Sequence, residues 1–125
     1  MESNLNILVT GGAGFIGSYL VDKLLENNNV HVLDNLSSGN IEHINRWSSN
    51  NRFKFFKLDL VKDPLILDDK YSIIFHLAAN PDVRISSINP KDQLEQNVIA
   101  TFNILEYARK HDIDTFVFTS SSTVY

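Results

Sequence analysis

Residues 10–17 read T-G-G-A-G-F-I-G, and this stretch decides the fold of the chain. It follows the apolar run Ile7–Val9 and opens a segment with helical spacing, so its glycines lie where a strand passes into a helix. Gly11, Gly14 and Gly17 meet three needs: a tight turn, close approach of the backbone to a pyrophosphate, and close packing of helix on sheet. Because free amides and the positive end of the helix dipole bind anions, the stretch predicts a phosphate-binding turn.

An acid at the end of the next strand supports this interpretation. A dinucleotide-binding turn predicts such an acid about 20 residues further on, and Asp34 follows the apolar run Val30–Leu33. Its carboxylate can accept hydrogen bonds from both hydroxyls of an adenosine ribose and repels a 2′-phosphate. Asn35 follows, where an NADP site more often offers an arginine. The pair predicts NAD as the cofactor, with a plain strand-ending role for Asp34 as the alternative.

Size and composition bound the remaining possibilities. A chain of 125 residues with 43% hydrophobic content predicts one globular domain. A net charge of −4 and a pI near 5.4 leave no basic surface for nucleic acid or an anionic membrane. The apolar runs are too short to span a membrane and the first residues do not resemble a signal peptide, so we expect a cytoplasmic protein. The absence of cysteine excludes thiolate chemistry and disulfides. The four histidines show no metal-ligand spacing, so we expect no metal site and expect each histidine to be structural or exposed.

Apolar runs alternate with helical segments along the chain, as in repeated βα units. Strands are expected near residues 6–10, 30–33, 53–57, 72–77 and 115–120, and helices over 14–27, around 41–47 and over 90–111. The helical offsets predict that the first helix packs through Phe15, Ile16, Tyr19, Leu20 and Leu24, and the long helix through Leu94, Val98, Thr101, Leu105 and Ala108. The fold class is therefore α/β: a Rossmann-type, doubly wound parallel sheet of order 3-2-1-4-5, with helices on both faces and the chain cut after the fifth strand.

The motifs together resemble the extended short-chain dehydrogenase/reductase superfamily, in particular its UDP-glucose 4-epimerase group and related nucleotide-sugar epimerases and dehydratases. The resemblance covers the whole chain. It is carried by the glycine stretch, by V-L-D-N-L-S-S-G at residues 32–39, L-D-L at 58–60, H-L-A-A at 76–79, Asn97 with Thr101, and T-S-S-S-T-V-Y at 119–125.

The resemblance implies a set of cofactor-binding residues along the sheet edge. The amides around Gly14, Phe15 and Ile16 would hold the pyrophosphate, between the turn glycines Gly11 and Gly17. The adenosine half would meet Asp34, Asn35, Ser37, Ser38, Gly39, Asp59 and Leu60, and the cofactor would lie over Leu77, Ala78 and Ala79, with Asn97 near the groove. Close helix packing is the alternative role for Ala78 and Ala79, and a bond to nearby backbone is the alternative for Asn97.

Ser121 is the candidate catalytic residue. The resemblance implies that it hydrogen-bonds the sugar hydroxyl oxidised at C4, in a nucleotide-sugar epimerisation that returns the hydride to the other face; a plain strand-ending role is the alternative. Related dehydratases carry an Asp-Glu pair where this chain has Ser122 and Thr123. This difference disfavours dehydration, and it also disfavours a decarboxylase that needs glutamate beside Val124.

The family's catalytic Tyr-x-x-x-Lys does not follow the serine motif, because the sequence stops at Tyr125. Tyr19 and Lys23 have the same spacing but lie on the first helix. We therefore expect the 125 residues to be the N-terminal NAD-binding domain of a longer nucleotide-sugar enzyme, inactive alone, which as the whole protein pairs into a homodimer through the 90–111 helix. A dehydratase or reductase of the same superfamily, or a non-catalytic dinucleotide sensor, are the alternatives.

Overall fold

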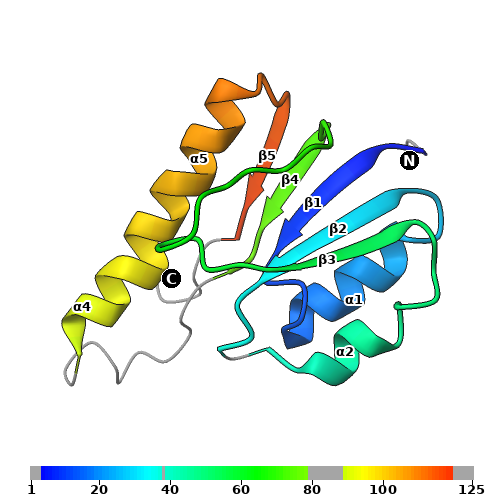
Figure 1. Cartoon of the computed structure of the whole chain (residues 1–125), viewed down its shortest axis with the longest axis horizontal. Helices are drawn as coiled ribbons and strands as arrows, with labels where there is room; N and C mark the ends of the chain where they lie inside the picture. The colour runs from blue at the N-terminus through cyan, green and yellow to red at the C-terminus, as the bar shows by residue number, and fades with distance from the viewer. Residues whose placement is uncertain (1–3, 38, 79–88, 120–125) are drawn as a thin grey trace.

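Five parallel strands form a single sheet of order β3-β2-β1-β4-β5 in the computed structural model, which describes residues 4–37, 39–78 and 89–119 (Figure 1). The strands are β1 (Asn6–Thr10), β2 (Asn29–Asp34), β3 (Phe53–Lys57), β4 (Ile73–His76) and β5 (Thr115–Phe118). The predicted order is confirmed, and the observed bounds differ from the predicted ones by one or two residues at most where both ends are described. Val9, at the centre, pairs with Val32 on one side and Phe75 on the other.

Helices cover both faces of the sheet, as predicted (Figure 1). On one face lie α1 (Phe15–Leu24) and α2 (Ile41–Asn45). On the other lies a continuous helical segment made of α4 (Pro90–Gln93), the π-helical turn η1 (Leu94–Ile99) and α5 (Ala100–Lys110). None of the helices in the described ranges is long and apolar enough to cross a membrane.

Alternation along the strands sends neighbouring side chains into two different cores. Val9 and Val32 pack with Val21 of α1 in the first core, while Leu8 and Ile74 pack with Ile104 of α5 in the second. A central strand buried on both faces explains why Ile7–Val9, the middle of β1, is an unbroken apolar run.

The predicted packed face of α1 is wrong in part: Leu24 is buried and Leu20 packs against the first core, but the other three residues do not. Phe15, Ile16 and Tyr19 are exposed, whereas Gly17 and Val21 are buried. The reason is the close approach of Gly17 to the sheet: a Cβ at Gly17 would lie 2.3 Å from the carbonyl oxygen of Gly11. Since that contact turns the Gly17 side of the helix inward, the residues four and seven positions later are buried with it. The helix also ends at Leu24, three residues before the predicted end.

The long helix begins at Pro90 as predicted, but the π-helical turn interrupts it. The hydroxyl of Thr101 donates to the carbonyl oxygen of Asn97 at 2.6 Å and so competes for an acceptor of the α-helical ladder. Such a turn holds an extra residue, so α-helical offsets are not kept between Pro90–Gln93 and Ala100–Lys110. The predicted stripe is wrong in part. Leu94, Val98 and Leu105 are exposed, and the buried residues are Ala100, Ile104, Tyr107 and Ala108.

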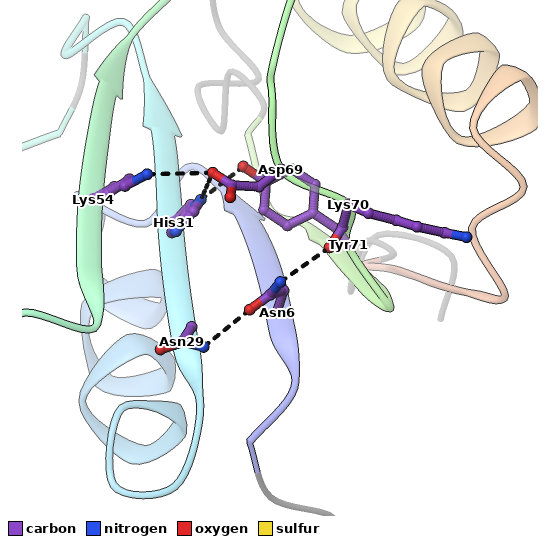
Figure 2. Close-up of polar contacts among 7 residues, drawn as sticks. All are labelled: Asn6, Asn29, His31, Lys54, Asp69, Lys70 and Tyr71. Carbon is purple, nitrogen blue, oxygen red and sulfur yellow. Dashed lines mark hydrogen bonds and ion pairs between the residues drawn. The ribbon is translucent and has the colours of Figure 1, made fainter.

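A polar cluster ties the amino-terminal ends of the strands to the segment before β4 (Figure 2). His31 Nδ1 lies 2.7 Å from the Tyr71 hydroxyl, and Lys54 pairs with Asp69 at 3.3 Å. Asn6 donates to the carbonyl oxygen of Lys70. Burial lowers the pKa of His31. This cluster lies at the sheet edge opposite the carboxyl ends of the strands, and its contacts give His31 the structural role expected from the sequence.

Candidate dinucleotide site

The glycine turn after β1 separates two kinds of glycine. Gly11 has a φ of +74°, and a Cβ there would lie 2.7 Å from the amide nitrogen of Ala78. Side chains are therefore excluded at Gly11 by conformation and by space, and at Gly17 by its contact with Gly11. Gly14 is different, because the nearest atom to a Cβ there would be 3.4 Å away. A Cβ at Gly14 would therefore make only an ordinary van der Waals contact, and the missing side chain leaves the backbone at the start of α1 accessible to a ligand.

Unpaired amides point out of the first turn of α1. No side chain caps this helix, and the first hydrogen bond in it runs from Ser18 N–H to the Gly14 carbonyl oxygen at 2.9 Å. The amides of Phe15, Ile16 and Gly17 have no partner among the described residues. The expectation that Gly14 offers its amide needs correction, since that N–H closes the turn on the Gly11 carbonyl at 3.2 Å. Three free amides at the positive end of a ten-residue helix suit a pyrophosphate.

Asp34 lies at the carboxyl end of β2, beside this turn, and is only 8% exposed. Its two oxygens accept hydrogen bonds from Ala13 N–H at 3.1 Å and from Leu36 N–H at 2.8 Å. Each carboxylate oxygen has a second acceptor position. Asp34 therefore holds the glycine turn against β2 and can still receive ribose hydroxyls, so the structural and cofactor-binding roles are compatible.

Ala13 connects the glycine turn to the segment at the start of α2, a contact that the sequence did not predict. Its carbonyl oxygen accepts from the Asn40 amide at 3.0 Å and from His43 Nδ1 at 2.7 Å. Because a carbonyl only accepts, Nδ1 of His43 carries the proton. Gly39 packs on the same residue, and a Cβ at Gly39 would lie 2.7 Å from that of Ala13. Asn35 and Ser37 form an exposed turn beside it through Asn35 Oδ1 and the Ser37 amide.

Asp59 and Leu60 follow β3 at the same edge of the sheet. Asp59 closes its own turn, with Oδ1 accepting from the Val61 amide at 2.8 Å. Leu60 is buried in the second core, and its carbonyl oxygen accepts from Asn103 Nδ2 at 2.7 Å. The Leu60 carbonyl thus already has a hydrogen-bond donor in Asn103. We therefore expect the backbone contact between Leu60 and adenine to be made by the Leu60 amide.

The segment after β4 lies directly beneath the glycine turn. The amide of Leu77 donates to the Thr10 carbonyl oxygen at 3.0 Å, and the amide of Ala78 donates to Thr10 Oγ1 at 3.2 Å. The backbone of Ala78 is the part of this segment that would meet a Cβ on Gly11, so a close fit between the two strand ends is built into the site.

A buried histidine connects this segment to the long helix. His76 Nδ1 lies 2.6 Å from Thr10 Oγ1, and Nε2 lies 2.9 Å from Thr101 Oγ1. The only proton of the Thr101 hydroxyl goes to the Asn97 carbonyl, so Thr101 must accept from Nε2–H. Burial lowers the pKa of His76 from 6.5 to about 4. The imidazole is neutral at physiological pH, and no signal in the sequence indicated that it takes part in this network.

The structure brings most of the predicted site residues to the carboxyl edge of the sheet. Asn97 is half-buried on η1 and joins the network through its carbonyl. Three predicted residues, Ser38, Ala79 and the catalytic candidate Ser121, lie outside the described residues. No group of metal-ligating side chains that could hold an ion is found within the described ranges.

Comparisons with known proteins agree with this geometry. The family described as the NAD dependent epimerase/dehydratase family matches residues 7–125. A Methanocaldococcus jannaschii protein provisionally named a UDP-glucose 4-epimerase is 48% identical, over 92% of this chain and 37% of its own length. UDP-glucuronic acid decarboxylase 5 of Arabidopsis thaliana is 40% identical, over 99% of this chain and 36% of its own length.

A solved structure is similar as well. The UDP-N-acetylglucosamine 4-epimerase of Methanobrevibacter ruminantium, solved with UDP-N-acetylmuramic acid, superposes with a TM-score of 0.90 at 37% identity, over 99% of this chain and 40% of that one. The chain thus spans about two fifths of the length of these relatives. The glycine turn, the acid after β2 and the family match lead to one conclusion: the chain belongs to the NAD dependent epimerase/dehydratase family.

Proposed function

We propose that this chain forms the NAD-binding part of a nucleotide-sugar 4-epimerase of the UDP-glucose/UDP-galactose type. One observation carries the proposal. Three unpaired amides at the start of α1 and the buried carboxylate of Asp34, at the end of the next strand, lie at the same edge of the sheet. The amides suit a diphosphate, and the carboxylate suits a ribose with two free hydroxyls. The missing side chain at Gly14 lets the diphosphate approach the amides.

The remaining proposed contacts follow the same edge. Asp59 Oδ2 has room for the amino group of adenine, because the turn of its own segment occupies Oδ1. The amide of Leu60 completes the contact, and the cofactor lies over Leu77 and Ala78. Asn35, Ser37 and Gly39 line the ribose, with Ser38, Ala79 and Asn97 proposed from the family pattern.

The chemistry of the proposed reaction is a transient oxidation of the sugar at C4. NAD supplies the hydride acceptor when it is bound. Ser121 is proposed to hydrogen-bond the C4 hydroxyl. The hydroxyl proton leaves in the same step, and the family pattern assigns its acceptor to the tyrosine of the Tyr-x-x-x-Lys motif, which does not follow the serine motif in residues 1–125.

Substrate conversion by the complete gene product tests the activity. We expect UDP-galactose to be converted to UDP-glucose, and Ser121→Ala to lower the rate by about a hundredfold, within the usual effect of one positioned proton-transfer group. Lys110→Ala, at an exposed position on α5, serves as the control. Failure to interconvert the two sugars would remove the 4-epimerase proposal.

A titration tests the cofactor proposal separately. We expect the chain to bind NAD, though weakly, and to bind NADP at least about tenfold more weakly, because Asp34 repels a 2′-phosphate. Asp34→Asn keeps the shape of the side chain and should reduce that preference. Equal affinity for NAD and NADP in the parent chain would contradict the assignment of Asp34.

A second candidate function is decarboxylation of a UDP-glucuronic acid, favoured by the 40% identity to the plant decarboxylase. Thr123, which stands where the family pattern for that reaction has glutamate, disfavours it. Release of carbon dioxide from UDP-glucuronic acid, without interconversion of UDP-hexoses, would select this candidate. Dehydratase or reductase activity on a nucleotide sugar, or a sensor without activity, are separated by the same assays.

We also propose that the whole protein is a cytoplasmic homodimer paired through the long helix. Leu94, Val98, Phe102 and Leu105 form an exposed apolar stripe along its outer side, and Phe102 is 58% exposed. A stripe of this kind on a helix indicates an interaction surface.

A further inference from the structure

Two polar side chains in the first turn of α5 reach two different segments of the candidate cofactor groove. Asn103 donates through Nδ2 to the carbonyl oxygen of Leu60 at 2.7 Å, a contact between residues 43 positions apart. Thr101 accepts from Nε2–H of His76 at 2.9 Å. Neither contact belongs to the regular hydrogen bonding of the helix or the sheet, so the two contacts need a separate explanation.

The contact of Asn103 fixes the turn that carries Asp59. This turn is closed locally by Asp59 and Asp63, with the Asp59 amide donating to Asp63 Oδ2 at 2.7 Å. The local bonds set its shape but not its position relative to the sheet. Its position is set by the Leu58 amide, which donates to the Asp34 carbonyl oxygen at 3.2 Å, by the buried Leu60 side chain and by Asn103. Without Asn103 the partly buried carbonyl of Leu60 loses its partner, so Asn103 holds the far side of the turn that carries the Asp59 carboxylate.

The contact of Thr101 fixes the segment after β4 through a chain of hydrogen bonds with one direction. Ala78 N–H donates to Thr10 Oγ1, Thr10 donates to His76 Nδ1, and His76 Nε2–H donates to Thr101. The chain ends where Thr101 donates to the Asn97 carbonyl oxygen at 2.6 Å. Each hydroxyl donates once and accepts once, so every member depends on the next. Loss of the Thr101 hydroxyl would leave a buried N–H of His76 without an acceptor.

We propose that Asn103 and Thr101 are positioning residues, and that each one positions a different part of the cofactor groove. Asn103 sets the adenine end through Asp59 and Leu60, and Thr101 sets, through His76 and Thr10, the backbone of Leu77 and Ala78 beneath the rest of the molecule. This proposal rests on the proposed NAD site. One helix thus aligns the two halves of the groove, although neither side chain contacts the ligand.

The test uses two ligands that differ only at the base. Nicotinamide hypoxanthine dinucleotide replaces the adenine amino group with an oxygen, which the Asp59 carboxylate repels. Wild-type chain should therefore prefer NAD by about tenfold, the effect of one hydrogen bond to a charged group. Titration calorimetry gives the dissociation constants of both ligands for each variant, and thermal unfolding shows that each variant is folded.

The two variants should give different patterns. Asn103→Ala should weaken NAD and bring the ratio of the two dissociation constants close to one, and Asn103→Gln, which keeps the donor on a longer chain, should recover part of the ratio. Thr101→Val should weaken both ligands by the same factor and leave the ratio at its wild-type value, and Thr101→Ser should restore affinity. Lys110→Ala, at an exposed position on the same helix, should change neither quantity.

Each alternative result has a separate meaning. If Asn103→Ala weakens both ligands equally, Asn103 only stabilises the fold and the proposal is overturned for that residue. If Thr101→Val changes the ratio or leaves NAD affinity intact, the proposal is overturned for Thr101. Should Asn103→Ala not fold, the ratio measured for Asn103→Gln decides, and an unchanged ratio there counts against the proposal. If the wild-type chain binds neither ligand, the proposed NAD site itself fails and this inference fails with it.

Discussion

At the scale of single residues, the glycine turn gives each of its glycines a different physical task. Gly17 keeps α1 against the strand end, since a Cβ there would lie 2.3 Å from the Gly11 oxygen. At Gly14 the same oxygen would lie 3.4 Å from a Cβ, an ordinary contact, so a methyl group fits there beside the free amides. Stability and ligand binding should therefore respond to different glycines.

Alanine at these two positions should separate the two tasks. Gly17→Ala should lower the free energy of unfolding by about 3 kcal/mol, because the added methyl group overlaps a backbone oxygen. Gly14→Ala should change it by less than about 1 kcal/mol and weaken NAD binding, because the methyl group fills the space that the diphosphate needs. Urea unfolding and calorimetric titration measure the two effects. An equal loss of stability in both variants would contradict this assignment.

His76 should make stability depend on pH. Its folded pKa of about 4 lies below the ordinary histidine pKa of 6.5, so the unfolded chain binds more protons between these pH values. Stability is complete above pH 6.5 and falls as the pH drops, by up to about 3 kcal/mol for this group. His31, whose pKa burial also lowers, acts with the same sign.

His76→Asn isolates this effect from the carboxylates that titrate in the same range. The variant should be less stable than wild type at pH 7 by about 2 kcal/mol, because two buried hydrogen bonds are lost. The difference should shrink toward pH 5, where only the wild type has lost the stability of the neutral imidazole. A difference that stays constant between pH 7 and pH 5, measured by urea unfolding, would be inconsistent with a depressed pKa.

Spacing along the chain predicted the glycine turn and the acid after β2, but not the residues that hold this turn and its neighbours in place. Ala13, His43 and Asn103 act through hydrogen bonds to backbone atoms of distant loops, and such contacts depend on loop conformation rather than on residue pattern. A histidine beside a helix start and an asparagine on a helix are too common to be assigned a partner from the sequence. Their tasks became visible only once the distances were known.

At the scale of elements, the strands were predictable and the buried faces of the helices were not. The run at residues 6–10 identified a strand with correct bounds. A strand that is buried on both faces forms a continuous apolar run, which is easy to recognise in a sequence. The exposed faces of α1 and α5 carry large apolar side chains, so hydrophobicity alone pointed to the wrong side of α1. The contact at Gly17 and the π-helical turn, which set the true faces, leave no simple hydrophobic pattern.

The start of α2 acts as a support for the glycine turn, and His43 is the residue to change. His43→Ala removes one of the two donors to the Ala13 carbonyl, so it should lower the free energy of unfolding by about 1 kcal/mol. It should also weaken NAD binding, since Ala13 immediately precedes the open position at Gly14. Glu42→Ala, an exposed neighbour on the same helix, is the matched control. Unchanged stability and NAD affinity in His43→Ala would show that the Asn40 amide alone is enough to hold the Ala13 carbonyl in place.

At the scale of the whole molecule, the sheet order followed from the sequence of elements, because crossover connections between parallel strands are right-handed and short. The convergence of the glycine turn, Asp34, Asp59 and Ala78 on one edge followed from the same rule. The oligomeric state could not be predicted from the sequence pattern, because an exposed apolar stripe does not identify the molecule that covers it. A measurement of mass in solution is needed.

The apolar stripe on the long helix predicts how copies associate. Phe102→Lys places a charge in the middle of the stripe and should lower the fraction of dimer at a given concentration by about tenfold or more, since a buried charge opposes association. Light scattering after size exclusion measures the fraction, for the complete gene product. Lys110→Ala, outside the stripe, should leave it unchanged. A parent protein that is monomeric at every concentration measured would count against the homodimer.

The extra residue held by the π-helical turn has a consequence for register. An α-helix advances about 100° per residue, so deleting one residue between 94 and 99 would restore regular winding and rotate everything before it by about that angle. Asn89 accepts a hydrogen bond from the Asp92 amide at 3.3 Å and caps the start of α4. After the deletion, this cap would lie on a different side of the helix axis. An insertion or deletion of one residue here therefore redirects a whole chain segment, while leaving Ala100–Lys110 in place.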